Sequence, residues 1–524
     1  MDEPLRCVTD DCILTGWDFS TGAVKCLAFD LDGRVIAQVN LPTDLWKGEP
    51  EHLAISELNL MQLEGQARSS VRAIAARLRE AGRLSDWQAG GISATHHTAG
   101  RIDKDRVQVR RAICWNDQTL AAYREQGEKR LGGREAVIKF ISGPWADRYS
   151  LSHLVKDEDP AYLSLEQWKR TWRILLHGPL AAGYLTGNFD VTSISSAAST
   201  GILDFRRRRW ARGMLSALAD EKLRALAWKQ LPKIVDQYEP IGALSEDLAL
   251  EAGIDPKRRP LVFPTSDDQQ AGLVGGGAVG PGQVAIILGN SAVVNSSAEK
   301  LPKTFDLDVM CLNWGPYLLM RCYTNGATLL NKTAGSTSGW TKQQWDQLEG
   351  EARRVLAGCD GVGVMPFLYS EPSLGVTGKK VGIRWFGGEP TAPGMRRRAS
   401  LEALAYLIAM GVEAHEAAGQ KVADISVSGG VSRSDLMCEI LATVLGRPLK
   451  RLKSEEGPAL GAAVTALAAL EANLRAKKKI KAPFTVADAA AVLVKYRGEV
   501  KPNTEWSAAY KKGFAEFKQR LKKL

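Results

Sequence analysis

Two segments of the chain share one arrangement, and this arrangement constrains the fold more than any other feature. Residues 12–18 (CILTGWD) read as a strand, and a turn containing glycine leads from them to a second strand-like segment at 23–30. The apolar segment 284–288 (VAIIL) is likewise followed by Gly289 and a further apolar stretch at 292–295. We therefore predict that a β-hairpin opens each of two similarly built halves, although the halves share no obvious sequence repeat.

The rest of the 524-residue chain alternates helical and extended patterns, which is typical of an α/β fold. A glycine cluster at 275–282 marks the boundary, so we expect domains at 1–275 and 276–524. Strands are predicted at 88–93, 110–115, 261–265 and 424–428, and helices at 58–81, 120–131, 163–185, 434–445 and from Gly457 onward. Tyr510, Phe514, Phe517 and Leu521 recur at helical spacing and predict a C-terminal amphipathic helix docked on the protein.

The net charge of +10 raises the question of nucleic-acid binding. The basic residues fall in separate clusters at 206–209, 396–398, 477–481 and 511–523, beside helical stretches. No helix-turn-helix, zinc-finger or RNA-binding signature accompanies them, so we interpret them as solvated surface and expect no nucleic-acid partner. A positive field would still favour the approach of ATP and other anions.

Cysteine usage and hydropathy indicate where the protein works. The eight cysteines include no CxxC pair, so we expect reduced thiols and no metal or disulfide framework. The N-terminal sequence MDEPLRCVTDDC is acidic, unlike a signal peptide, and no apolar run reaches the ~18–20 residues of a membrane span. We therefore expect a cytoplasmic protein without a membrane partner, either a monomer or a homodimer.

Three glycine-containing turns follow predicted strands and suit phosphate binding. The first hairpin carries Asp18, Thr21 and Lys25 around a tight turn, whose backbone N–H groups can form an anion-binding concavity. The segments 288–291 and 428–432 are comparable turns in the second half. Any one of them could be an ordinary turn, but three at strand ends favour a nucleotide site.

An acidic pair, Asp267 and Asp268, stands at a predicted strand end next to the domain boundary. Phosphoryl transfer to a hydroxyl group requires a carboxylate that accepts the hydroxyl proton. The alternative is a structural role, in which an Asp caps the helix beginning near Gln270. His97 also lies at a strand end and could bind a polyhydroxylated ligand, and Trp115 beside polar residues is a common sugar-binding combination; both could equally be structural.

Several nucleotide-binding classes are excluded by their motifs. The chain has no Walker P-loop, no protein-kinase set of glycine-rich loop, HRD and DFG, and no GxGxxG after a first strand.

Taken together, the motifs resemble those of the FGGY carbohydrate kinases of the sugar kinase/Hsp70/actin superfamily, over nearly the whole chain. GWDFSTGAVK at 16–25 is similar to the first phosphate motif, and LGNS at 288–291 to the second. SGGVS at 428–432 with PALGAA at 458–463 is similar to the adenosine motif. The start GWDFST and CWND at 114–117 are similar to xylulokinases.

The resemblance implies an α/β fold of two ribonuclease H-like (actin-like ATPase) domains, with mixed five-stranded sheets and a cleft between the domains. It implies ATP-dependent phosphorylation of a ketopentose, D-xylulose before other sugars, with ATP and Mg²⁺ as cofactors. Asp268 would be the catalytic base, and Asp18 would organise the metal. The sugar would be bound by His96, His97, Asp268, Gln269, Trp115 and Arg148. The nucleotide would be bound by Thr21, Lys25, Gly289, Asn290, Trp340, Gly429, Gly430 and Ser434.

Some positions depart from the family pattern. Asn290 replaces the usual Thr, while Ser193 and Ser196 stand where xylulokinases often carry Asp. Asp267 replaces a Gly, and a second carboxylate beside the base could raise the pKa of that base by like-charge repulsion. Two alternatives therefore stay open. The chain could be a kinase for D-ribulose or another polyol such as glycerol, or it could be a sugar- or nucleotide-binding sensor without turnover.

Overall fold

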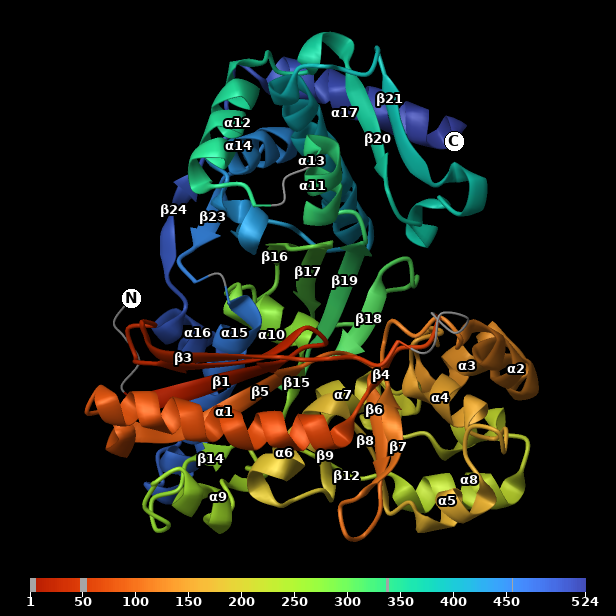
Figure 1. Cartoon of the computed structure of the whole chain (residues 1–524), viewed down its shortest axis with the longest axis vertical. Coiled ribbons are helices and arrows are strands. Elements are labelled where there is room, and N and C mark those ends of the chain that lie inside the picture. The colour runs from red at the N-terminus through yellow and green to blue at the C-terminus, as the bar shows by residue number, and fades with distance from the viewer. Residues whose placement is uncertain (1–5, 48–53, 336–338, 455) are drawn as a thin grey trace. The chain divides into compact units, whose positions relative to one another are not determined.

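The computed structural model describes residues 6–47, 54–335, 339–454 and 456–524 (Figure 1). They form two compact units, and each unit draws on distant parts of the chain. The first unit contains 1–275, 309–318 and 457–494, and the second contains 276–308, 319–456 and 495–524. The division at 275–276 coincides with the predicted boundary, whereas residues 457–494 return to the first unit. The assignment of 1–275 and 276–524 to two sequence domains stays a prediction.

The first unit is built on a seven-stranded sheet in the order β13-β14-β5-β1-β2-β3, with β15 also paired to β5. Its strands are β1 (Ile13–Phe19), β2 (Ala23–Phe29), β3 (Val35–Pro42), β5 (Trp87–Ala94), β13 (Gly242–Ala243), β14 (Leu261–Val262) and β15 (Ser266–Asp267). Strands β1 and β2 form the predicted antiparallel hairpin, and β1, β14 and β15 run parallel to β5. The sheet is therefore mixed.

A smaller sheet and several helices complete the first unit. The smaller sheet has the order β4-β7-β6-β8 and consists of β4 (Glu57–Leu58), β6 (Ala99–Ile102), β7 (Gln108–Ile113) and β8 (Arg173–Leu176). Two short ladders pair β9 (Val191–Ser193) with β12 (Lys233–Val235) and β10 (Leu203–Asp204) with β11 (Arg209–Trp210). The helices are α1 (Leu60–Glu80), α2 (Ala121–Leu131), α3 (Arg134–Ile141), α4 (Ser150–Lys156), α5 (Leu165–Arg170), α6 (His177–Thr186), α7 (Ile194–Ala198), α8 (Glu221–Gln230), α9 (Glu246–Glu251), α10 (Asp268–Gly275), α15 (Gly457–Lys477) and α16 (Val486–Leu493).

The second unit is built on a seven-stranded sheet in the order β18-β19-β17-β16-β22-β23-β24, and its last six strands repeat that plan. The strands are β16 (Gln283–Leu288), β17 (Ala292–Ala298), β19 (Tyr317–Tyr323), β22 (Asp424–Ser428), β23 (Leu449–Leu452) and β24 (Tyr496–Val500), while β18 (Asp308–Cys311) contains the point where the chain passes into the first unit. A separate hairpin joins β20 (Gly363–Phe367) to β21 (Gly382–Phe386). The helices are α11 (Ala327–Ala334), α12 (Lys342–Arg354), α13 (Pro393–Ala417), α14 (Asp435–Leu445) and α17 (Ser507–Lys523).

The two sheets share a five-strand core, β3-β2-β1-β5-β14 in one unit and β19-β17-β16-β22-β23 in the other. In each core an antiparallel hairpin, β1–β2 or β16–β17, is followed by a parallel partner, β5 or β22. This confirms a two-unit α/β fold with mixed sheets, but the expected five strands per sheet are too few. The additional strands β13 and β15 have only two residues each, and β24 is largely exposed. Hydrophobic periodicity in the sequence therefore does not predict these strands.

One prediction was wrong in the first unit. The segment 163–185 was expected to be helical throughout, but β8 interrupts it between α5 and α6. The apolar residues Ile174, Leu175 and Leu176 pair with β6 instead. A short apolar run fits a buried strand and a buried helix equally well, and here the partner strand decides the outcome.

Glycines let helix α15 lie directly against the first sheet. A Cβ atom added to Gly16 would lie 1.7 Å from the carbonyl oxygen of Ala459, and one added to Gly91 would lie 2.1 Å from that of Ala462. Because side chains alternate along a strand, Trp17 points to the opposite face and donates a hydrogen bond to Ser70 of α1 at 3.0 Å. Figure 1 shows α1 along this face. The backbone contact with α15 therefore needs small residues.

The predicted helices from Gly457 onward and at the C-terminus are present as α15 and α17. The expectation that no apolar run reaches the length of a membrane span was wrong for α15: within the described residues this helix alone has that length and apolarity, and 78% of its apolar window is buried inside the protein. Helix α17 packs with Tyr510 and Phe517 buried, and the Tyr510 hydroxyl accepts a hydrogen bond from Arg398 at 2.6 Å. None of the eight cysteines forms a disulfide bond in the structure.

Candidate active site

The carboxyl ends of three neighbouring strands in the first unit bring the predicted site residues together. Strand register places Asp18 of β1 opposite Ser93 of β5, and Ser266 of β15 on the other side of Ser93. Because β1 and β15 are parallel to β5, the residues that follow each strand emerge at the same edge. This edge carries Asp18, the two histidines after β5 and the acidic pair, and ligands of open α/β sheets bind at such an edge.

Asp267 is held on several sides by hydrogen bonds. Its side chain accepts from the Ser195 hydroxyl at 3.0 Å and from the backbone N–H of Gln270 at 3.0 Å. Its own backbone N–H donates to the Ser195 oxygen at 3.0 Å. Asp267 is only 3% exposed. The capping role considered for the acidic pair therefore falls to Asp267, at the start of α10.

Asp268, by contrast, keeps 32% of its side chain exposed. Its Oδ1 atom lies 3.2 Å from Nδ1 of His96, and the Gln269 amide donates to its Oδ2 at 3.5 Å. An accessible carboxylate at a strand edge is able to accept a proton from a bound hydroxyl group. Of the pair, Asp268 alone combines exposure with this position.

His96 lies between the two carboxylates. Its Nε2 atom forms an ion pair with Asp267, and its Nδ1 atom faces Asp268. Burial acts to lower the pKa of His96, but Asp267 and then Asp268 overcome this and raise the pKa to about 9. The donor atoms of these three residues lie within 4.8 Å of one another. We interpret the group as an ion-paired cluster in which the imidazole is the cation beside the two carboxylates.

His97 presents a neutral ring. It adopts φ 62°, a left-handed conformation uncommon for a residue with a side chain. The ring is stacked between His96 at 4.9 Å and Tyr149 at 4.6 Å, measured between ring centroids. Burial, with His96 and Arg148 adding to it, lowers the pKa of His97 well below its usual value.

The hydrogen bond of His97 defines what the ring offers a ligand. Its Nδ1 atom lies 2.9 Å from the carbonyl oxygen of Ser199. A carbonyl oxygen only accepts, so Nδ1 carries the proton in the neutral ring and Nε2 is left as an acceptor. This arrangement suits a ligand hydroxyl group.

The first hairpin supplies the remaining acidic group. Asp18 is half-buried and accepts a hydrogen bond from Ser93 at 2.8 Å. Lys25 stands opposite Asp18 in the register of β1 and β2, and Thr21 lies in the connecting turn. A half-buried carboxylate with further oxygen groups nearby is a donor set that Mg²⁺ accepts.

Trp115 and Arg148 belong to the same unit. Trp115 follows β7, is 44% exposed, and its backbone N–H donates to Thr98 at 3.4 Å, close in sequence to His97. Arg148 precedes Tyr149 and influences the pKa of His97 electrostatically. Both therefore adjoin the site on the side of His97.

A hydroxyl cluster occupies the positions where carboxylates were expected from the family resemblance. Ser196 and Thr265 are 2.9 Å apart between their oxygen atoms, and Ser193 lies 3.1 Å from Ser196. Ser193 also caps α7 by accepting from the Ser196 backbone at 3.0 Å. These serines are engaged in internal hydrogen bonds, so they stabilise the strand edge.

The second unit holds the other two predicted turns. Gly289 accepts a hydrogen bond from Ala327 at 2.8 Å, and Asn290 accepts one from Gly326 at 3.0 Å, which ties this turn to the start of α11. Gly429 has φ 87°, and an added Cβ would lie 2.5 Å from the Leu288 carbonyl oxygen. Glycine is therefore required where β16 and β22 end side by side.

A cavity of about 820 Å³ adjoins these turns. Its lining includes Gly289, Asn290, Gly430 and Ser434, together with Lys342, Trp345, Asp346, Glu349, Arg397 and Arg433. Ser434 accepts a hydrogen bond from the Met437 backbone at 2.9 Å and so caps α14. The volume lies within the range of small-molecule sites.

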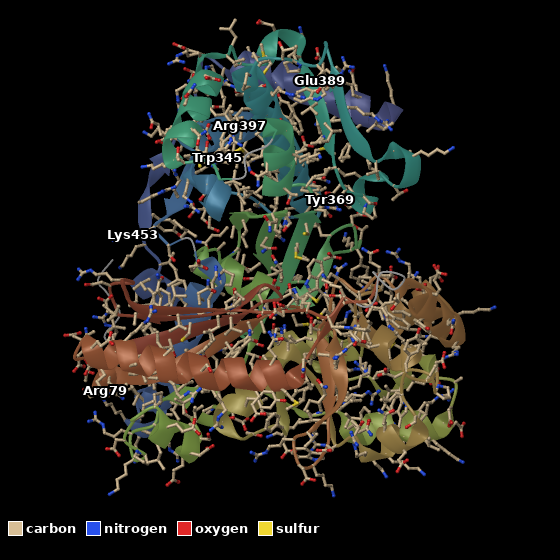
Figure 2. The ribbon with its side chains drawn as sticks, in the orientation of Figure 1. Arg79, Trp345, Tyr369, Glu389, Arg397 and Lys453 are labelled. Carbon is tan, nitrogen blue, oxygen red and sulfur yellow. The ribbon has the colours of Figure 1, made fainter. Side chains whose placement is uncertain are left out.

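Trp345 and Arg397 both line this cavity, and Figure 2 labels the two side chains near each other in the second unit. Arg397 binds Glu349 at 3.0 Å and lies 5.9 Å from the centre of the Trp345 ring. Trp340, predicted to contact the nucleotide, is absent from the cavity lining; its ring packs against Trp345 at 5.0 Å. Trp345 is therefore the tryptophan that faces the space.

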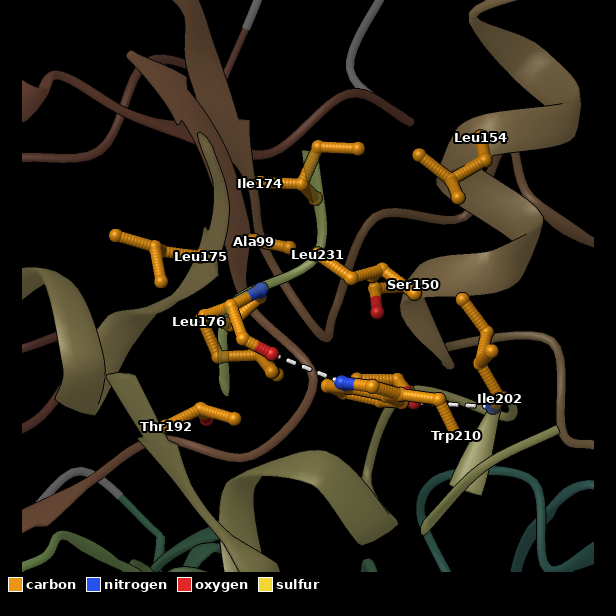
Figure 3. A pocket seen from close by; sticks show the side chains of 12 residues that line it. Ala99, Ser150, Leu154, Ile174, Leu175, Leu176, Thr192, Ile202, Trp210 and Leu231 are labelled. Atoms are coloured by element: carbon orange, nitrogen blue, oxygen red, sulfur yellow. Dashed lines mark hydrogen bonds between the residues drawn. The ribbon is translucent and has the colours of Figure 1, made fainter. Parts of the chain in front are cut away.

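A second cavity, in the first unit, is too small to bind a substrate. It provides only about 10 Å³ among Leu176, Ile202 and Trp210, and Trp210 donates to the Pro232 carbonyl at 2.9 Å (Figure 3). This is at the lower limit for one water molecule. It cannot hold a sugar.

Three residues that were not predicted from the sequence hold the site residues and their neighbours in place. Tyr149 stacks on His97, and Ser195 holds Asp267. The Asn313 amide donates to the Thr265 carbonyl at 3.0 Å and accepts from the Ser195 backbone at 2.8 Å. The serine-rich stretch 191–199 offered a weak signal for Ser195, whereas nothing in the sequence singles out Tyr149 or Asn313.

Comparison with known proteins shows the family to which the chain belongs. The model of the FGGY family of carbohydrate kinases, N-terminal domain, matches residues 13–275, and that of the C-terminal domain matches 387–470. The chain is 24% identical to a xylulose kinase of Bacillus subtilis over 468 residues, 86% of this chain and 87% of that protein.

Two solved structures are similar over almost the whole chain. A gluconate kinase from Lactobacillus acidophilus aligns with a TM-score of 0.80 and 19% identity, over 97% of each chain. A kinase from Brucella ovis described as a xyloylose kinase aligns with a TM-score of 0.78 and 22% identity, over 97% of this chain and 98% of that one. The chain belongs to the FGGY family of carbohydrate kinases, and it is an ATP-dependent sugar kinase.

Proposed function

We propose that this kinase transfers the γ-phosphoryl group of ATP to the terminal hydroxyl of a ketopentose, D-xylulose, and that Asp268 is the catalytic base. The observation that carries the proposal is the partly exposed Asp268 carboxylate at the strand edge that also presents the His97 acceptor. Similarity to proteins described as xylulose kinases supports the choice of sugar.

In this reaction the sugar hydroxyl gives its proton to Asp268 as its oxygen bonds to the γ-phosphorus. The bond from the γ-phosphorus to the bridging oxygen breaks, and ADP leaves with the electron pair. Such transfers depend mainly on positioning and charge stabilisation. His97 would orient the sugar through Nε2, and Gln269 would help to hold the Asp268 carboxylate at 3.5 Å.

ATP would bind in the second unit in the cavity lined by Gly289, Asn290, Gly430 and Ser434. Glycine turns at strand ends expose backbone N–H groups, which suit phosphate oxygens. The Trp345 face and the Arg397 guanidinium offer a flat, polar-edged wall for a purine base. Thr21 and Lys25 of the first hairpin are proposed to contact the phosphates.

Asp18 would hold Mg²⁺, directly or through water. Bound Mg²⁺ neutralises charge on the phosphates during transfer. The hydrogen bond from Ser93 fixes the Asp18 carboxylate at the same strand edge as Asp268, which supports this assignment.

The proposal is tested by ADP release with Mg-ATP and a panel of acceptors: D-xylulose, D-ribulose, L-xylulose, L-ribulose, glycerol and D-gluconate. We expect kcat/KM to be highest for D-xylulose. Gluconate is included because a gluconate kinase shares the fold, and glycerol tests the simplest polyol.

A higher kcat/KM for any other acceptor would overturn the choice of D-xylulose. An absence of ADP release across the panel, together with ATP binding measured by calorimetry, would favour a sensor without turnover.

A further inference from the structure

We propose that His96 is a positioning residue of the kinase site: as a cation held between Asp267 and Asp268, it orients the Asp268 carboxylate and offsets the negative charge of Asp267 beside it. This inference rests on the proposed role of Asp268 as the base. It assigns a function to the second carboxylate, which a base acting alone does not require.

The contacts of His96 use both ring nitrogens. Nε2 pairs with Asp267 and Nδ1 lies 3.2 Å from Asp268 Oδ1. A neutral imidazole has only one N–H group, whereas the protonated ring can donate to both carboxylates at once. Contact of both nitrogens with carboxylates therefore favours the charged ring.

Asp267 is a fixed anchor for this arrangement. Ser195 and the Gln270 backbone hold its two oxygens, each at 3.0 Å. The partner on the other side, Asp268, is the more exposed of the two carboxylates. His96 thus links the accessible Asp268 carboxylate to Asp267, which is buried and held by hydrogen bonds. This link limits the movement of the Asp268 side chain.

The stack of rings fixes the orientation of His96. The His97 ring lies against it at 4.9 Å with an angle of 19° between the planes, and Tyr149 continues the stack beyond His97. At 6% exposure the His96 side chain has little room to rotate. Both ring nitrogens are therefore kept beside the carboxylates.

The charged groups around the cluster are consistent with one cation between two anions. Burial lowers the pKa of His177, which adjoins Asp268, to about 4, so that ring is neutral at pH 7. Burial also keeps His97 neutral, while Arg148 and His153 act on His97 from the α4 side. The pKa of His96 itself is raised to about 9 by the two carboxylates against the effect of burial.

The first test is the pH dependence of kcat/KM for His96→Gln, Asp267→Asn and the double variant. Removing the cation leaves the two carboxylates facing each other, so His96→Gln should move the acidic limb to higher pH by about one unit. It should also remove the alkaline limb near pH 9 that loss of the His96 proton gives the parent enzyme. Asp267→Asn should move that alkaline limb to lower pH.

The double variant distinguishes an effect of the His96 charge on the pH profile from an effect of its side-chain packing. Without either member of the ion pair, its acidic limb should return towards that of the parent enzyme, within about 0.3 unit. A merely structural role for His96 would instead lower activity equally at all pH values, with no recovery in the double variant. That result would overturn the inference.

A second measurement does not depend on activity or on a folded variant. The chain has six histidines, so selective ¹⁵N-histidine labelling gives a countable set of imidazole signals. In the parent enzyme one ring should stay protonated on both nitrogens at pH 8 and titrate near pH 9. If every histidine has lost its second proton by pH 8, the inference is wrong.

The failure of the inference can be told apart from failure of the proposed function. If Asp268→Asn retains near-normal turnover, Asp268 is not the base and the inference loses its premise. If Asp268→Asn is inactive but the pH profile of His96→Gln matches that of the parent enzyme, the base assignment stands and only the role of His96 is rejected.

Discussion

Asp267 accepts a hydrogen bond from the backbone N–H of Gln270 at 3.0 Å, and this one contact separates the tasks of two adjacent carboxylates. Asp267 is committed to the start of α10, while Asp268 is left accessible at the strand edge. Sequence alone presented the pair as one acidic motif with two possible explanations. In the structure each explanation applies to a different residue.

Changing His97 should weaken sugar binding more than turnover. In His97→Asn the left-handed backbone conformation is tolerated but the ring acceptor at Nε2 is lost. Loss of one hydrogen bond to a substrate hydroxyl costs about 1–3 kcal/mol, so we expect the KM for the sugar to rise roughly 10- to 100-fold. The KM for ATP should not change. Steady-state kinetics with each substrate varied in turn checks this, and an equal rise in both KM values would contradict it.

Changing Trp345 should weaken the binding of ATP and leave the binding of the sugar unchanged. Trp345→Ala removes one wall of the cavity in the second unit and should raise the KM for ATP about 10-fold, with the sugar KM unaffected. Tyr369→Ala is a matched control, because this aromatic side chain of the same unit is 45% exposed and is not part of the cavity lining. If both variants bind ATP as tightly as the parent in calorimetry, the nucleotide site lies elsewhere.

Packing between α10 and α15 depends on the lack of a side chain at Gly461. A Cβ atom there would lie 1.8 Å from the Ala271 carbonyl oxygen, so Gly461→Ala should lower the free energy of unfolding by about 1–3 kcal/mol. Gly22→Ala is the control, because nothing lies within 4 Å of an added Cβ. Urea denaturation of both variants measures the difference. Equal stability would show that the two helices can separate without cost.

The stability of the protein should also report on His96. Its pKa in the folded state, about 9, lies above the usual 6.5, so the ion pair stabilises the folded state fully below pH 6.5 and this contribution is lost as the pH rises through 9. The difference in melting temperature between the parent and His96→Gln should therefore be largest near pH 6 and shrink by pH 9.5. A difference that does not change with pH would exclude a titrating ion pair.

Much of the fold could be predicted because its central strands are apolar and end in recognisable turns. The hairpin β1–β2, strand β22 and helix α14 lie within one or two residues of their predicted positions. Strand β8 could not be predicted, since its apolar residues suit a helix until the partner β6 is known. The two-residue strands β13 and β15 depend on neighbours rather than on their own sequence.

Part of the candidate site could also be predicted from the sequence. Asp18, His97 and Asp268 follow predicted strands, so their common edge could be inferred from parallel pairing. The ion pair of His96 with Asp267 could not, because it joins segments far apart in sequence through side-chain orientation. The expectation that Asp267 could raise the pKa of the base by like-charge repulsion did not include this cation. Trp340 was predicted to contact the nucleotide, but the structure places Trp345 in the cavity lining, with the Trp340 ring packed against it.

The central claim is that Asp268 takes the proton from the sugar hydroxyl, and its most direct test is kcat with D-xylulose and Mg-ATP for Asp268→Asn. Loss of a positioned base should lower kcat by about 10²–10⁴-fold. Sugar affinity, measured by calorimetry, should stay within a few-fold of the parent. Asp105→Asn, on an exposed loop of the same unit, serves as the matched control and should retain parental turnover. A kcat for Asp268→Asn within a few-fold of the parent value would contradict the account and make Asp267 the next candidate.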